Sequence, residues 1–422
     1  MKNQINRILG IALLFPAGVF AAEMPETREC HYPQPQGASL FSALACGKVN
    51  GSIRTLYYST HNANFVTARN QDTVSYGGSI NYETADYYGF SAGISGIFVR
   101  GIDHPDSAHT LSSLADNQTN VGEAWLRWHD DALSITAGDQ RVNLPFVSDY
   151  DWRITPILFR GVDAHYGDKE DFLHASRLWR YKPWGSDRFQ ATSAYTNVSE
   201  KTDGMWAAGL GRTWRAAEKK LSGQLWYENY QDYARLFYSE GRLRWLNYRW
   251  QPDIGLQFIR GTGAGREWLG EVDSTSYGIQ FSATPLPKMH WDINYDHIAS
   301  HPSAWNNGSV VVPYAHSTSS GPWFAQPYFT STEDLGSGNA YSTNVAYSLQ
   351  EALKVGARYS FMDLKADVAA PGINQSEYMV FFTWFAPGIF TGFNLSDYAG
   401  VQTSSRYKKN FWQNRLTLKY DF

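Results

Sequence analysis

Apolar and polar residues alternate in short segments along most of the chain after residue 48. In the last segment, Leu416, Leu418, Tyr420 and Phe422 alternate with charged or polar residues. A period of two residues places successive side chains on opposite faces of a β-strand. Counted in this way, the pattern predicts about 18 strands, an even number of the kind found in bacterial single-chain barrels.

The connections between these segments differ in length. Tight turns, such as the one at residues 83–88, alternate with longer polar loops, such as residues 101–117 and the longest loop at residues 299–339. Outer-membrane barrels show this asymmetry, with short turns on the periplasmic side. A terminal aromatic residue on an alternating strand, here Phe422, looks like the signal read by the barrel assembly machinery. We therefore predict an all-β fold, a transmembrane antiparallel β-barrel spanning residues 48–422.

The N-terminal residues have the pattern of an export signal. Lys2 and Arg7 precede a short apolar run at residues 8–20, and small residues follow. We predict that residues 1–21 are a signal peptide and that residues 22–47 are a periplasmic segment with one short helix near residues 40–44. The full chain contains 27 Tyr, 16 Trp and 23 Phe, yet its mean hydropathy is -0.42. An apolar outer face with aromatic girdles and a polar interior explains both values, although composition alone also fits a soluble β-sandwich.

The chain has two cysteines, Cys30 and Cys46, close to the predicted mature N-terminus. An oxidising compartment favours a disulfide between them. Two cysteines are too few for a usual thiolate metal site, so we predict no metal and no cofactor. The net charge of -4 does not suggest a nucleic-acid partner.

Residues 135–166 read as a strand, a long loop and a second strand. Strand connections are usually short, and a loop folded into a barrel lumen to narrow the pore would account for this one. Its pattern resembles the third loop of the OprD-type specific porins of Gram-negative outer membranes. The matching residues are Gly138, Leu144, Pro145, the stretch from Asp149 to Arg153, Pro156, Phe159, Arg160 and Gly161, whereas Tyr150 stands where the family has Asn. The resemblance implies an inward-folded constriction loop, and we take Asp149, Asp151 and Arg153 as its candidate residues.

Charged residues within the strands should face the lumen, because an unpaired Arg or Lys at the lipid midplane costs about 2–4 kcal/mol. Closure of the barrel would place Arg54 of the first strand beside Arg415 and Lys419 of the last. We predict a basic wall, which the resemblance implies would draw in carboxylated nutrients. An acidic wall with Asp292 and Asp296 is expected opposite. The residues assigned to the basic wall are Arg54, Arg127, Lys354, Arg358, Arg415 and Lys419.

The sequence contains no strong catalytic motif: there is no Gly-x-Ser-x-Gly, no His-Glu-x-x-His and no phosphate-binding loop. We predict an outer-membrane porin, not an enzyme, for passive and selective diffusion of small carboxylate-bearing nutrients such as amino acids, peptides and organic or aromatic acids. Its expected partners are small anionic solutes, outer-membrane lipid and the assembly machinery, and association into a homotrimer is left open. The aromatic residues of the longest loop keep a chitooligosaccharide or sugar channel as an alternative. An outer-membrane hydrolase or plugged receptor is the alternative from another class.

Overall fold

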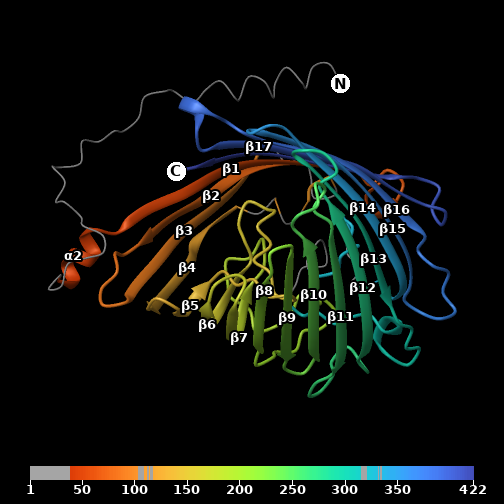
Figure 1. Ribbon diagram of the computed structural model, residues 1–422, viewed down its shortest axis with the longest axis horizontal. Helices are drawn as coiled ribbons and strands as arrows, with labels where there is room; N and C mark the ends of the chain where they lie inside the picture. The colour runs from red at the N-terminus through yellow and green to blue at the C-terminus, as the bar shows by residue number, and fades with distance from the viewer. Residues whose placement is uncertain are drawn as a thin grey trace.

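The computed structural model describes residues 39–102, 109–111, 114, 117–314, 321–330, 332 and 335–422. In this part of the chain, 18 antiparallel strands form one closed sheet (Figure 1). Closure follows from strand β1 (Lys48–His61), which pairs with β2 (Gln71–Glu83) on one side and with β18 (Phe411–Asp421) on the other. The predicted barrel and its strand number are therefore confirmed.

The strands follow one another around the barrel in chain order. A short helix, α2 (Leu40–Ala45), precedes β1. The other strands are β3 (Phe90–Ile102), β4 (Gln118–His129), β5 (Leu133–Gln140), β6 (Leu158–Gly167), β7 (Phe172–Lys182), β8 (Met205–Arg215), β9 (Lys219–Tyr230), β10 (Ala234–Trp245), β11 (Asp253–Gly263), β12 (Asp273–Ala283), β13 (Met289–Ile298), β14 (Ser337–Gln350), β15 (Leu353–Lys365), β16 (Gln375–Phe385) and β17 (Phe393–Ser404).

Side-chain burial alternates along the strands as the sequence pattern predicts. In β1, Arg54, Leu56 and Tyr58 are buried inside the barrel, whereas Ile53, directly before Arg54, is 46% exposed on the outer face. The apolar residues Leu416 and Leu418 of β18 are also exposed on the outer face. These outward side chains form the surface that meets lipid.

Short and long connections lie at opposite ends of the barrel. The turns at residues 130–132 and 351–352 are tight, and the two chain ends of the sheet lie at the same end, where Ser52 pairs with Asp421. The long connections at residues 141–157, 183–204 and 299–336 leave the other end. Parts of all three pack together against the inner face of the barrel wall, in one buried cluster that includes Phe146, Val198 and Val311.

Two segments interrupt the succession of strands. Gly388–Phe390 form a 3-10 turn, and β17 begins only at Phe393. Gly388 and Gly392 have φ values of 67° and 102°, which interrupt an extended strand. Residues 189–196 contribute a single bridge, between Tyr181 and Gln190, and no strand.

The N-terminal predictions are only partly covered by the structure. The predicted signal peptide and Cys30 lie outside the described residues, so the signal peptide and the disulfide to Cys46 remain predictions. Within the described part, no helix is long and apolar enough to cross a membrane.

Candidate functional site: the constriction

The central loop, residues 141–157 between β5 and β6, is anchored at its start to the inner face of β9 and β10. Phe146 is fully buried, and its ring meets those of Tyr238 and Trp323 edge-on at 6.0 Å each. The backbone of Phe146 is also held, since its carbonyl accepts a hydrogen bond from the Tyr230 hydroxyl at 2.8 Å. This half of the loop is therefore fixed mainly by apolar packing.

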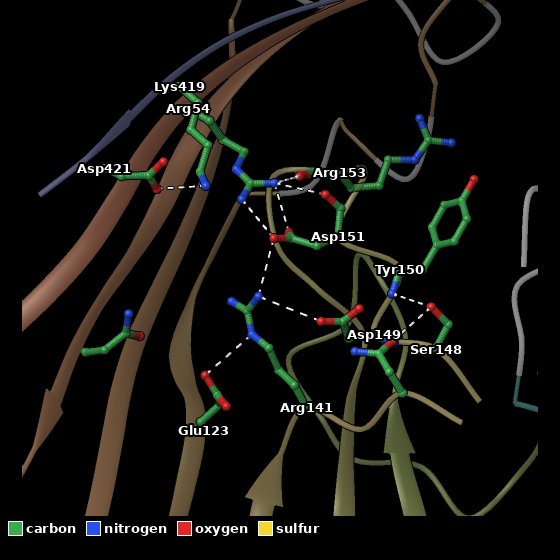
Figure 2. A network of polar contacts seen from close by, with 12 residues as sticks. Arg54, Glu123, Arg141, Ser148, Asp149, Tyr150, Asp151, Arg153, Lys419 and Asp421 are labelled. Atoms are coloured by element: carbon green, nitrogen blue, oxygen red, sulfur yellow. Dashed lines mark hydrogen bonds and ion pairs between the residues drawn. The ribbon is translucent and has the colours of Figure 1, made fainter. Parts of the chain in front are cut away.

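Arg54 of β1 holds the second half of the central loop through hydrogen bonds. Arg54 donates from Nη1 to Asp151 Oδ1 at 2.8 Å and from Nη2 to Asp151 Oδ2 at 3.1 Å (Figure 2). It also donates to the Arg153 carbonyl at 2.7 Å. Such a forked, charge-assisted contact is strong and directional. The loop thus crosses the lumen from the β9–β10 wall to β1, and Arg54 acts as its anchor.

Arg141 lies at the start of the central loop among three carboxylates (Figure 2). Its distances to the carboxylate oxygens of Asp151, Glu123 and Asp149 are 3.3, 3.6 and 3.9 Å. The Arg141 side chain is 34% exposed, whereas that of Arg54 is 8% exposed. Arg141 is therefore a cation of the constriction that solutes can reach. Sequence reasoning missed it, although its position directly after a strand and before the inward loop was a usable signal.

The carboxyl group of Asp149 makes the constriction sensitive to pH. Burial raises the pKa of Asp149, the neighbouring Arg141 opposes this effect, and Asp151 adds to it. Because a raised pKa means that the carboxylate is protonated at a higher pH, acidification removes this negative charge before that of an ordinary aspartate. Anion preference should therefore increase on acidification, at pH values above those at which an ordinary aspartate becomes protonated. Reversal potentials in a KCl gradient measure this change, and D149N should reduce it; an unchanged pH response in D149N would contradict the assignment.

Two further guanidinium groups flank the ring of Tyr58. Arg153 of the central loop lies 5.1 Å and Arg415 of β18 lies 5.2 Å from the centre of that ring. Nε and Nη1 of Arg153 and Nε of Arg415 are buried without a hydrogen-bond acceptor, and no carboxylate of the described residues is within 4.0 Å of either group. Burial, together with the Arg415 charge, lowers the pKa of Arg153 to about 10, which leaves it charged at neutral pH. The β1–β18 side of the constriction therefore carries unbalanced positive charge.

The other residues of the predicted basic wall lie at different places. Lys419 is next to Arg54 in the strand register and pairs with Asp421 at 2.7 Å. Arg127 and Lys354 lie at the short-turn end, where Arg127 packs over Trp125. Arg358 is covered, since its Nη2 donates to the Gln326 carbonyl at 2.5 Å. The structure thus brings Arg54, Arg415 and Lys419 together, and it separates Arg127, Lys354 and Arg358 from them.

The carboxylates of β13 do not form an acidic wall opposite Arg358. Only β14 separates β13 from β15, where Arg358 pairs in register with Asn344, and Asn344 pairs with Asp292. Asn344 Nδ2 also donates to Asp292 Oδ2 at 3.2 Å. The expectation of an acidic wall opposite Arg358 was therefore wrong. It considered which side chains point into the lumen, but not how close β13 and β15 lie around the barrel.

A second segment meets the central loop inside the barrel. Residues 321–330, which we call the strap, belong to the long connection between β13 and β14. Tyr328 of the strap stacks on Tyr398 of β17 with 4.7 Å between ring centres, and Trp152 of the central loop meets Tyr328 edge-on at 5.1 Å. A cavity of about 430 Å³ lies between the central loop, the start of the strap and the β9–β10 wall, and its lining includes Asn143, Gln224 and Glu240.

Comparison with known proteins identifies the architecture. Residues 109–290 match the family model described as outer membrane porin, OprD family. The structure of OpdK from Pseudomonas aeruginosa superimposes with a TM-score of 0.74 at 19% identity, covering 90% of this chain and 99% of OpdK. A structure of OpdK with vanillate gives 0.73 at 17% identity, covering 90% and 99%. A BenF-like porin from Pseudomonas fluorescens Pf-5 gives 0.75 at 14% identity, again covering 90% and 99%. No curated protein sequence matches the chain.

Proposed function

Because this chain is an outer-membrane β-barrel with a confirmed resemblance to the OprD porin family, we propose that it is a selective porin for small carboxylate-bearing nutrients. Transport is passive, and selectivity arises where the central loop crosses the lumen. Family and fold favour a channel over an enzyme.

The observation that carries this proposal is the excess of cationic groups beside the constriction. Within the part of the chain that the structure describes, Arg54 has a carboxylate partner, Asp151, whereas Arg153 and Arg415 have none within 4.0 Å. A guanidinium group binds carboxylates through paired hydrogen bonds and stays charged at any physiological pH. The field of Arg153 and Arg415 attracts anions to the constriction, and the exposed Arg141 offers them direct contact. The presence of vanillate, an aromatic carboxylate, in the OpdK structure supports this class of solute.

The sugar-channel alternative depends on exposed aromatic platforms in the longest loop. Trp323 and Phe329 are 4% and 5% exposed, and both are packed against other side chains. Stacking on a sugar ring needs an open aromatic face. The burial of these two rings therefore favours a structural role for Trp323 and Phe329, and it gives less support to a sugar channel.

Planar-bilayer recording of the purified, folded barrel tests the proposal. We expect anion-selective conductance in a KCl gradient, and faster liposome uptake of benzoate than of its neutral analogue benzamide. R153Q and R415Q should each lower the anion-to-cation permeability ratio, by about twofold or more. R188Q, at an exposed site in the connection between β7 and β8, is the matched control and should behave as the wild type. Cation preference, or block by chitooligosaccharides but not by benzoate, would contradict the proposal.

A further inference from the structure

The strap is held against the barrel wall by two buried carboxylates. Asp296 of β13 accepts the backbone N–H of Ala325 at 2.6 Å. Glu377 of β16 accepts the backbone N–H of Tyr328 at 2.7 Å and that of Phe329 at 3.0 Å. Asp296 and Glu377 are 1% and 2% exposed, so these contacts are shielded from water. A buried N–H group that loses its acceptor costs free energy, so these contacts favour one position of the strap.

The wall residues around these carboxylates complete the attachment. Gln257 donates to Asp296 at 2.8 Å, and Gln402 donates to Glu377 at 3.1 Å, which orients each carboxylate toward the strap. Between them, Arg358 donates to the strap carbonyl of Gln326. Strand residues thus hold both the donor and the acceptor groups of the strap backbone.

The wall is also shaped to receive the strap side chains. A Cβ atom at Gly400 would lie 2.6 Å from the Phe329 ring, and one at Gly255 would lie 3.2 Å from the Phe324 ring. Because Gly400 has no side chain, the Phe329 ring fits against the wall at this position. On its other side, the strap contacts the central loop through Tyr328 and Trp152. A shift of the strap would consequently change the opening that the central loop leaves.

We propose that Asp296 and Glu377 are positioning residues that latch the strap to the wall and so set the width of the constriction. This role rests on the proposed channel function and adds a second determinant to it. The carboxylates touch backbone groups and not the solute. Without the latch, the amides of the strap are released into the water-filled lumen, where water can replace their acceptors. The strap can then move without disrupting the strands.

The test compares D296N, E377Q and E377A with the wild type in planar bilayers and in chymotrypsin digestion. Loss of the latch should raise the mean single-channel conductance by about twofold or more. It should also expose the strap to cleavage after Phe324, Tyr328 and Phe329. E377Q keeps one acceptor oxygen and should lie between the wild type and E377A. Glu351→Gln, at an exposed position in the turn between β14 and β15, is the matched control and should change neither readout.

Heat-modifiable migration in SDS gels reports whether each barrel is folded. Folded variants with wild-type conductance and wild-type cleavage would overturn the latch. Failure of D296N and E377Q to fold would overturn it as well, because a latch that only positions the strap is not required for barrel formation. A folded wild type without conductance would refute the channel function, and cleavage of the variants would still decide whether the latch exists.

Discussion

Replacement of Arg54 by leucine is expected to release the second half of the central loop and give a larger, noisier conductance. Arg54 makes two hydrogen bonds to the Asp151 carboxylate, one to the Asp151 carbonyl and one to the Arg153 carbonyl. These hydrogen bonds join the loop to β1 in the described residues. Removing one partner of a fully buried ion pair costs about 3–5 kcal/mol. Asp151 is 29% exposed and keeps Arg141 as a neighbour, which reduces the cost to about 2–3 kcal/mol. Displaced loop conformations should therefore become about 30- to 150-fold more populated.

Single-channel traces of the folded R54L barrel measure this effect as a higher mean conductance with frequent fluctuations. R54K tests the geometry, since an ammonium group keeps the charge but cannot form the forked contact, and it should give an intermediate result. R188L removes an exposed arginine and serves as the control. Quiet, wild-type traces from R54L would show that Arg54 does not anchor the loop.

Replacement of Phe146 by alanine is expected to destabilise the first half of the central loop. Phe146 is fully buried among loop and wall side chains, including Tyr238 and Trp323. Truncation of a buried phenylalanine costs about 3–5 kcal/mol, from lost apolar burial and from the cavity that remains. The barrel itself should persist, because its closed ladder of strand pairs does not include residues 141–157. The loop should lose its inward packing and become sensitive to protease.

Limited proteolysis followed by mapping of the cut sites measures the F146A effect, and heat-modifiable migration confirms that the barrel is folded. F146L keeps most of the apolar volume and should remain largely protected. F390A, at a residue that is 58% exposed outside the strands, is the control. Protection of residues 141–157 in F146A equal to that of the wild type would contradict the packing role.

Much of the fold follows from local patterns. Alternation along β1 places Arg54 inside the barrel and Ile53 outside, because the strand period is two and lipid excludes unpaired charge. The same two-residue alternation places Arg415 and Arg358 inside the barrel. The order of strands, with β1 beside β18, follows from simple up-and-down connection and closure. The resemblance of residues 138–161 to the OprD third loop also predicted an inward-folded loop, and residues 141–157 do pack inside the barrel.

The details of the constriction depend on contacts between residues that are distant in sequence. Arg54 meets Asp151, and Arg358 meets Gln326, 32 residues away. The alternation along the strands predicts that both arginines point inward, but it does not distinguish an exposed cation from one covered by a loop. Both are covered, whereas Arg141, which has no strand position, is the exposed one. The sequence pattern could not predict which of these arginines is exposed, because the loop conformation depends on packing and pairing across the lumen.

The sequence by itself determined the rhythm of the strands, the two faces of the sheet and the site of the inward loop, since each depends on neighbouring residues and on the solvent that each face meets. Only the tertiary structure decided how the lumen is divided between the central loop, the strap and open space. Closure brings Arg153 and Arg415 to the same ring of Tyr58, and it places two strand carboxylates under the amides of the strap. These contacts join residues that are far apart in the sequence, so they arise only when the barrel has closed and the loops have folded inside it.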